Sequence, residues 1–253
     1  KKYRIGYFLD DGWFKATPGC ERVVLDAKKM LEEKGHTLIE FTPPDVSEAN
    51  RLFVSAVTVD GAKYLLGKVE NDLPPPVYLT ALMPLRLPII VQRLGGKLLG
   101  LLGYWRICKM GHAMALSTAE LRENYAGIES YRERMVKEMQ ARKIDMLLCP
   151  AAVLPAPPHE APLHLSAGVS YTALFNMLDY GAGVVRAGEW TVTDEANLDA
   201  YPTSDPWNTM GKKFAKDSVG LPLAVQIAAP PYREEAALKV LADIEDAYRA
   251  KKH

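Results

Sequence analysis

The sequence has 253 residues, of which 48% are apolar and 25% are charged, and its formal net charge is zero. This profile is typical of a folded globular protein of one large or two small domains, and the balanced charge argues against a general affinity for nucleic acid. The spacing and odd number of Cys20, Cys108 and Cys149 exclude a disulfide framework or zinc site built from them, so we expect an intracellular protein without a metal or other cofactor.

The first forty residues predict a strand, a helix and a second strand. Residues 3–9 alternate as a strand does, Thr17 and Pro18 are typical of a helix start, and Gly35 of a helix end. With a second strand at 37–41, this unit predicts a right-handed βαβ crossover in a parallel or mixed sheet. The turn between the first strand and the helix lacks the glycine-rich loop that holds phosphate, which argues against a nucleotide-binding domain.

Two further helices are predicted by their capping residues. Ser47 begins a helix over 47–59, and Ser117 with Glu120 forms a capping box that opens a long helix over 117–143. Both segments carry apolar residues at helical spacing. The positions expected to face inward are Leu52, Ala56 and Val59 in the first helix, and Leu121, Tyr125, Ile128, Met135 and Met139 in the second.

The stretch 73–119 contains no acidic residue, although the rest of the chain holds 31. No window in it is long and apolar enough to span a bilayer, so we expect two short apolar helices hinged at Gly95 and Gly96 that lie in a membrane interface. The alternative is a buried helical hairpin whose basic residues pair with acids elsewhere. The residues expected to contact the membrane are Leu82, Leu85, Arg86, Ile89, Ile90, Arg93, Leu94, Lys97, Leu98, Leu101, Leu102 and Trp105.

Residues 169–178 have helical length but almost no charged face. A helix that is apolar nearly all round belongs in an interior, and ten residues are too few to cross a bilayer, so we expect a core helix buried on every side. Asp179 and Gly181 are expected to end it, and 183–185 to form a short buried strand.

The remaining elements complete an α/β pattern. Strands are predicted at 145–149 and 219–227, and a closing surface helix at 234–248, with Leu238, Leu241, Ile244 and Tyr248 inward. Between them, 186–217 is expected to be an irregular excursion with a short strand at 191–193.

No residue pattern by itself indicates a catalytic centre. The five histidines share no metal spacing and are expected on the surface or in loops, and Asp10 with Asp11 is interpreted as a turn. The glycines from Gly181 to Gly188 match a dinucleotide fingerprint imperfectly and follow a helix, so we reject that interpretation. From the residues alone, the chain is an α/β domain with a membrane-seeking apolar hairpin.

Two motifs carry a resemblance to a known family. The first runs from Gly-Val-Ser-Tyr-Thr at 168–172 to Gly-Val-Val at 183–185, and the second is Ser-Val-Gly-Leu-Pro-Leu-Ala-Val-Gln at 218–226. The sequence resembles the C-terminal half of the fatty-acid amide hydrolases, in the amidase signature family. The resemblance implies that 1–253 is part of a single amidase domain, with a mixed twisted sheet flanked by helices and a membrane-interface helical cap inserted at 73–119.

The activity implied by the resemblance is hydrolysis of the C–N bond of fatty-acid amides, or of esters, through an acyl-enzyme. The family's Ser-Ser-Lys triad precedes the matched region, so we expect no catalytic residue in this chain and the triad upstream of Lys1. The absence of an initiator methionine fits that expectation. The residues implied to line the substrate channel are Ser166, Val169, Ala173, Trp207, Val57, Thr58, Thr80 and Ala81.

Several alternatives stay open. Plain core packing would also explain Ser166, Val169 and Ala173, and a non-catalytic lipid or membrane-interface module would also explain the hairpin. The partners implied are a fatty-acyl amide, a membrane surface and the missing N-terminal half of the enzyme, with no nucleic acid and with a homodimer left open. The expected location is the cytoplasmic face of an internal membrane.

Overall fold

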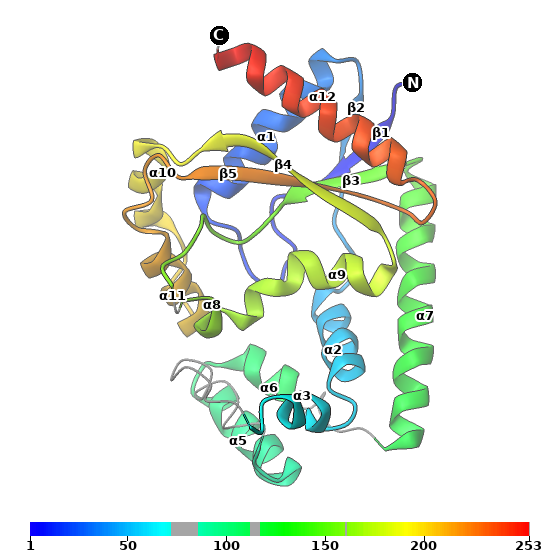
Figure 1. Ribbon diagram of the computed structural model, residues 1–253, viewed down its shortest axis with the longest axis vertical. Helices are drawn as coiled ribbons and strands as arrows, with labels where there is room; N and C mark the ends of the chain where they lie inside the picture. Colours follow the sequence, from blue (N-terminus) through cyan, green and yellow to red (C-terminus); the bar gives the residue numbers. More distant parts are fainter. Residues whose placement is uncertain (72–85, 112–116, 160, 253) are drawn as a thin grey trace.

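The computed structural model describes residues 1–71, 86–111, 117–159 and 161–252, and its centre is a mixed five-stranded sheet (Figure 1). The strands lie in the order β2-β1-β3-β5-β4. Their bounds are Arg4–Tyr7 for β1, Thr37–Glu40 for β2, Met146–Pro150 for β3, Gly181–Glu189 for β4 and Pro222–Ala229 for β5. β1 is parallel to β2 and β3, whereas β5 is antiparallel to β3 and β4, so the predicted mixed sheet is confirmed.

Helix α1 (Pro18–Glu33) joins β1 to β2, which confirms the predicted βαβ unit. Thr17 is the residue before the helix, but its hydroxyl does not cap it, contrary to our expectation. Instead, Thr17 Oγ1 donates to the carbonyl oxygen of Val153 at 3.0 Å. The hydroxyl therefore fastens the start of α1 to the loop that follows β3.

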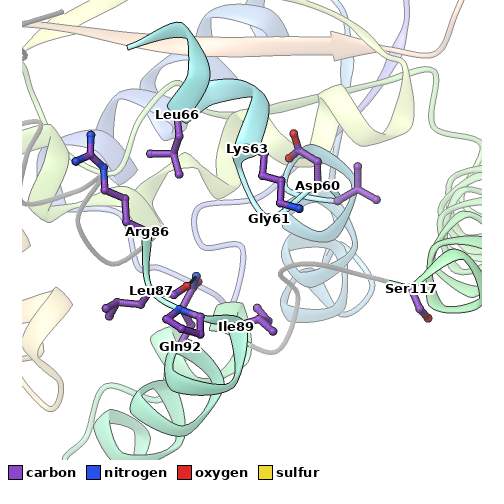
Figure 2. A pocket seen from close by; sticks show the side chains of 11 residues that line it. Asp60, Gly61, Lys63, Leu66, Arg86, Leu87, Ile89, Gln92 and Ser117 are labelled. Carbon is purple, nitrogen blue, oxygen red and sulfur yellow. Dashed lines mark hydrogen bonds between the residues drawn. The ribbon is translucent and has the colours of Figure 1, made fainter. Parts of the chain in front are cut away.

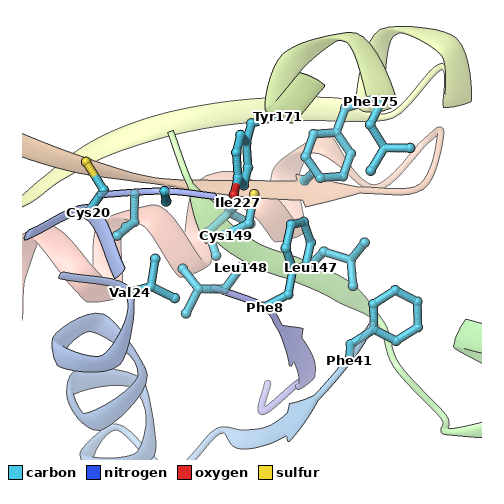
Figure 3. Packing of buried hydrophobic residues seen from close by; sticks show 14 of the residues in the cluster. Phe8, Cys20, Val24, Phe41, Leu147, Leu148, Cys149, Tyr171, Phe175 and Ile227 are labelled. Carbon is cyan, nitrogen blue, oxygen red and sulfur yellow. The ribbon is translucent and has the colours of Figure 1, made fainter. Parts of the chain in front are cut away.

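Helices cover both faces of the sheet. α1 and α12 (Glu234–Lys252) lie on one face, while α2 (Val46–Val57) and α9 (Ser170–Leu178) lie on the other, with α7 (Thr118–Ala141) beside them (Figure 1). In the core, Tyr171 and Phe175 point from α9 toward Phe8, Leu147 and Cys149 (Figure 3). Large apolar side chains thus fill the space between α9 and the sheet.

Helix capping agrees with the sequence in α7 and differs in α2. The Glu120 N–H donates to Ser117 Oγ at 3.2 Å, and the Ser117 N–H donates to Glu120 Oε2 at 2.8 Å, so the capping box is confirmed. In α2 the cap is Asp45 rather than Ser47, because Asp45 Oδ1 accepts the N–H of Glu48 at 3.0 Å.

Two inward positions predicted on the surface helices are wrong. Tyr125 of α7 is 54% exposed, and the buried positions beside it are Asn124 and Tyr131. Leu238 of α12 is 64% exposed, while Val240 on the same helix is buried. The other positions predicted to face inward are buried or half-buried, with Ile128, Met135 and Met139 buried in α7 and Leu241 and Ile244 buried in α12.

The helix α9 is not buried on every side. Thr172 and Asn176 are exposed and Val169, just before the helix, is 46% exposed, so one stripe faces outward. Asp179 ends the helix in a left-handed conformation with a φ of 55°, at the predicted place. The strand β4 that follows is longer than expected and lies at the sheet edge with Val184 62% exposed, so the prediction of a short buried strand is wrong.

The predicted irregular excursion contains regular helices. It holds α10 (Val192–Asn197), a 3-10 turn η3 (Leu198–Ala200) and α11 (Pro206–Ala215). The strand expected at 191–193 is wrong, because Thr191 and Asp194 form a capping box that begins α10. Arg22 of α1 then holds Asp194 through two hydrogen bonds of 2.8 Å, which attaches α10 to the sheet-covering layer.

The described part of 73–119 forms α5 (Ile89–Leu101) and α6 (Trp105–Gly111). In Figure 1, α5 lies below α3 (Lys63–Lys68) and α6 lies beside it. α5 passes through Gly95 and Gly96 without a break, so the predicted hinge is wrong. The turn lies instead at Gly103, which has a φ of +93°. Among the described residues, no helix has both the length and the apolar character needed to cross a membrane. A short helix α8 (Ala161–His164) and a 3-10 turn η2 (Ser166–Val169) precede α9.

Candidate functional site

The two motifs behind the family resemblance meet at a buried hydrogen bond. Gln226 of β5 donates through Nε2 to the carbonyl oxygen of Tyr171 at 2.9 Å, and the same nitrogen lies 3.4 Å from Cys149 Sγ. Gln226 is 4% exposed, so this bond is shielded from water. It fixes the first turn of α9 against the sheet and thereby sets the position of Ala173 on this helix and of Val169 just before it.

The Tyr171 hydroxyl attaches the same turn to the loop that follows β1. It accepts the N–H of Asp11 at 3.3 Å and donates to the carbonyl oxygen of Phe14 at 3.1 Å. The predicted turn at Asp10 and Asp11 is confirmed: Asp11 Oδ1 accepts the N–H groups of Trp13 and Phe14 at 2.8 and 3.0 Å. Burial raises the pKa of Asp11, and the hydrogen bonds that this carboxyl accepts oppose that rise.

The C-terminal end of α9 is held by α7. Arg132 donates through Nε to the carbonyl oxygen of Met177 at 2.8 Å, and its NH2 group lies 2.7 Å from Asp179 Oδ2. A cation at the end of a helix satisfies free carbonyl groups and interacts favourably with the helix dipole. α9 is therefore fixed at both ends by side chains from other elements.

The predicted channel residues on α9 and α2 lie on two helices that pack together. Val169 is 46% exposed and Ala173, one turn later, is buried. Ser166 begins η2, and its side chain lies outside the described part of the chain. At the end of α2, Val57 is 59% exposed, and Thr58 donates its hydroxyl to the carbonyl oxygen of Val54 at 2.6 Å.

Two other predicted channel residues, Thr80 and Ala81, fall outside the described residues, as do Leu82 and Leu85 of the predicted membrane contact. Trp207 is buried in the first turn of α11. The ring of Phe14 packs against both α11 and η2, at glycines that leave room for it. A Cβ atom added to Gly211 of α11 would lie 3.4 Å from this ring, and one added to Gly168 of η2 would lie 3.6 Å from it. The structure thus brings the turn carrying Val169 and the helix carrying Trp207 to one aromatic side chain.

The predicted membrane-contacting residues divide into an exposed set and a half-buried set. The exposed apolar side chains are Ile90, Leu94, Leu98, Leu101 and Leu102, with exposed fractions from 61% to 85%. Arg86 and Lys97 are also exposed, whereas Ile89 and Arg93 are half-buried. Trp105 differs from the rest, because it packs edge-on against the buried Trp13 with ring centroids 5.1 Å apart.

A cavity of about 700 Å³ lies between the α2–α3 connection and the start of α5 (Figure 2). Apolar and charged side chains both line it: Val59, Asp60, Lys63, Leu66, Arg86, Leu87, Ile89 and Gln92 are among them. The lining of the cavity begins within two residues of Val57 and Thr58 and reaches the first turn of α5 at Ile89 and Gln92. Its mixed lining suits a molecule with a polar end and an apolar tail.

Residues that the sequence did not single out join α6 to α11. Arg106, only 4% exposed, donates through NH1 to Asp205 Oδ1 at 2.7 Å and through Nε to the carbonyl oxygen of Trp13 at 2.5 Å. Asp205 followed by Pro206 is a helix-start pattern that was available in the sequence. The buried-hairpin alternative therefore holds for Arg106, whereas the apolar face of α5 is exposed.

The described side chains offer little for bond-breaking chemistry. Burial raises the pKa of the Cys20 and Cys149 thiols to about 12, so neither forms a thiolate near neutral pH. His36 is buried, contrary to the expectation of a surface position: its Nδ1 accepts the Tyr3 N–H and its Nε2 lies 3.2 Å from Asp243 Oδ2. Within 1–71, 86–111, 117–159 and 161–252, no cluster of three acidic, histidine or cysteine side chains is arranged to hold a metal ion.

The fold and the site define an α/β domain that has a mixed sheet, a helix joined to the sheet by a hydrogen bond between the two sequence motifs, and an exposed apolar face on α5. The model of the Amidase family matches residues 1–238, so the chain belongs to the amidase family. The chain is 42% identical to fatty acid amide hydrolase 1 of Caenorhabditis elegans over 252 residues, which are 99% of this chain and 44% of that protein.

Other relatives agree. The chain is 34% identical to fatty-acid amide hydrolase 1 of Sus scrofa, with 96% of this chain and 42% of that protein covered. A solved fatty acid amide hydrolase structure matches the fold with a TM-score of 0.71 at 20% identity, over 97% of this chain and 40% of that chain. The chain thus spans less than half the length of the relatives it matches, and the predicted amidase fold is confirmed.

Proposed function

We propose that this chain forms the acyl-chain-binding and membrane-docking portion of a serine hydrolase that cleaves the C–N bond of fatty-acid amides. Support comes from membership of the amidase family and from the likeness to fatty acid amide hydrolases over nearly the whole chain. The observation that carries the lipid part of the proposal is the exposed apolar face of α5.

That face has the properties of a helix lying in a membrane interface. Ile90, Leu94, Leu98, Leu101 and Leu102 fall within a stripe about 120° wide, which is the width of an ordinary apolar helix face. Fully burying one such side chain is worth about 1.5–3 kcal/mol, so even half of that for each residue gives substantial binding. Exposed basic residues such as Lys97 would add about 1 kcal/mol each on an anionic surface.

In this proposal the substrate's tail passes from the lipid through the cavity toward α9. The apolar residues Leu66, Leu87 and Ile89 line its outer end, and Val169 with Ala173 would form one wall further in. Each buried methylene of the tail contributes about 0.8 kcal/mol, so chain length would set specificity. Trp207 would border the leaving-group side of the amide.

The reaction would use the family's Ser-Ser-Lys triad, in the part of the family domain that this chain does not span. The serine oxygen attacks the amide carbonyl, the amine leaves with a proton, and water then releases the fatty acid. This chain would contribute orientation by holding the acyl tail. We further propose that the protein associates with the cytoplasmic face of an internal membrane.

The catalytic proposal is tested with the full protein that contains this chain. It should hydrolyse a long-chain acyl amide, such as a fatty-acyl p-nitroanilide, and react with a fluorophosphonate probe. A folded full-length protein that neither turns over the amide nor takes the label would refute catalysis and favour a non-catalytic lipid module.

The membrane proposal has its own test. Replacing Leu94 and Leu98 together by glutamate should abolish flotation of the full protein with phosphatidylcholine and phosphatidylserine vesicles. The matched control is Leu238→Glu on α12, an equally exposed leucine on a separate surface. Equal flotation of the doubly substituted protein and the control would contradict docking through α5.

A further inference from the structure

Arg106 is the buried cation of the hairpin and contacts segments far from it in sequence. Its guanidinium lies 4.5 Å from the Trp105 ring centroid and 5.2 Å from that of Phe14. With the bonds to Trp13 and Asp205, the group bridges α6, the loop after β1 and the start of α11. Because an unpaired buried charge is strongly disfavoured, these segments have to move together.

Asp205 carries the connection into α11. Its Oδ1 accepts the Arg106 NH1 group at 2.7 Å and the N–H groups of Trp207 and Asn208 at 2.9 and 3.2 Å. One carboxylate oxygen therefore both caps α11 and pairs with the hairpin. A shift of Arg106 would displace the atom that fixes the backbone of Trp207.

Trp207 and Asn208, in this first turn, each have a buried polar side-chain atom without a partner among the described residues. In the described ranges, neither the indole Nε1 of Trp207 nor the side-chain oxygen of Asn208 has a hydrogen-bond partner, and both residues are 6% exposed. Their placement therefore depends on packing and on the backbone that Asp205 holds.

The exposed helix α5 is closely joined to α6. A Cβ at Gly100 would lie 2.7 Å from Cys108 Cβ, so the two helices are in close contact at this point. A movement of α5 against a surface would thus be passed to α6 and then to Arg106. The contacts form a continuous physical path from the exposed apolar face to Trp207.

We propose that Arg106 is a positioning residue for Trp207, which couples the position of the hairpin on lipid to the first turn of α11 through Asp205. This inference rests on the proposed function, in which α5 docks on lipid and Trp207 borders the substrate. Lipid binding would then alter the substrate site itself as well as bringing the protein to its substrate.

The test uses the full protein carrying fluorinated tryptophan, with the Trp207 signal assigned by Trp207→Phe. Vesicles of phosphatidylcholine and phosphatidylserine should shift the Trp207 fluorine resonance in the wild type. They should lower the KM for a fatty-acyl p-nitroanilide by roughly fivefold, the lower end of ordinary coupling between sites. In Arg106→Met both responses should disappear, while kcat stays within about twofold, as expected when uniform binding is lost.

Three variants make the result specific. Arg122→Met removes an exposed arginine on α7 and should respond as the wild type does. Arg106→Lys keeps the charge but not the fork of donors, so it should restore part of the response. If Arg106→Met fails to fold, the double variant with Asp205→Asn leaves no unpaired charge and keeps the cap acceptor, and it should show the same loss.

A folded Arg106→Met protein that keeps the wild-type vesicle response would overturn the proposal, as would a vesicle-bound wild type whose Trp207 signal does not move. Failure of the proposed function is seen in the wild type alone: the wild-type protein then does not float with vesicles or does not hydrolyse the amide. Failure of the Arg106 proposal is seen only when the variants are compared with a wild type that does both. In a wild type that hydrolyses but does not float, an unchanged KM in Arg106→Met refutes positioning of Trp207 as well.

Discussion

Replacing Tyr171 by phenylalanine should destabilise the protein without creating a cavity. The ring is buried and would keep its packing, and only the hydroxyl is lost. That hydroxyl accepts the Asp11 N–H at 3.3 Å and donates to the Phe14 carbonyl oxygen at 3.1 Å. Burial raises the pKa of Tyr171 well above its ordinary value, so the hydroxyl stays protonated and can donate at any pH used in the assay.

The expected cost is about 2 kcal/mol. A buried backbone group left without a partner costs about 1–3 kcal/mol, and the bond to Asp11 is long enough to count for less than the bond to Phe14. The substitution should therefore lower the midpoint of urea unfolding at an unchanged m value.

Urea unfolding of the full protein measures the effect, with equal m values showing that the unfolded state is unchanged. Tyr180→Phe is the matched control, because among the described residues its hydroxyl donates to the weak acceptor Met139 Sδ at 3.4 Å, and the substitution should cost less than about 0.5 kcal/mol. If the two variants lose the same stability, the hydroxyl of Tyr171 does not anchor α9. Activity should fall as a higher KM in Tyr171→Phe alone.

Three further outcomes are expected. Burial raises the pKa of Asp11 in the folded protein, so the stability that its protonated carboxyl contributes is complete below the ordinary pKa of 3.8 and declines as the pH rises through the folded pKa. Asp11→Asn should therefore gain stability relative to wild type as the pH rises toward neutral. A pH-independent difference in urea midpoints would contradict this. Gly19→Ala should destabilise α1 by about 1–3 kcal/mol, because its Cβ would lie 2.5 Å from the rigid ring of Trp190, which outweighs the roughly 1 kcal/mol that alanine gains in a helix. Gly95→Ala has open space and should stabilise α5 by about 0.5–1 kcal/mol, whereas Gly103→Ala should cost about 1–2 kcal/mol at its positive φ; the opposite order in thermal melts would restore the hinge at Gly95.

Local signals were sufficient for much of the fold. The βαβ unit, the capping box at Ser117 and the end of α9 at Asp179 each depend on residues within a few positions of one another. Such signals act through the backbone next to them, so they survive folding. The same reasoning fails where a distant partner decides, as for Asn124, whose amide donates to the Leu52 carbonyl at 3.1 Å and turns that position of α7 inward in place of Tyr125.

The strand expected at 191–193 shows a second kind of error. A run of β-branched residues favours extended structure by propensity, yet Thr191 caps a helix with Asp194. Arg22, which lies far away in the sequence, then holds the Asp194 carboxylate with two hydrogen bonds. The tertiary partner and the cap together outweigh a propensity of at most about 1 kcal/mol.

The channel lining implied by the family resemblance stays a prediction. Ala173 of α9 and Val57 of α2 lie on two helices that pack together, an arrangement that plain core packing would also give. The pair of Arg106 and Asp205 was missed, because no periodicity connects two charged residues that are this far apart in sequence. An arginine in a stretch without acids was the one signal for it, since such a residue has to find its counter-ion elsewhere if it is buried.

The described part of the stretch without acids is therefore packed into the domain after Gly103 and exposed before it. Its composition is uniform, but the part after Gly103 turns Trp105 and Arg106 into the domain, where Trp13 and Asp205 receive them. The part before Gly103 presents large apolar side chains that no described residue covers. Contiguous exposed apolar surface of this kind is rare on soluble monomers and marks an interaction site. Because the charged residues on α5, Arg93 and Lys97, are both basic, an anionic lipid surface would complement this face better than a neutral partner, in keeping with the proposed membrane docking.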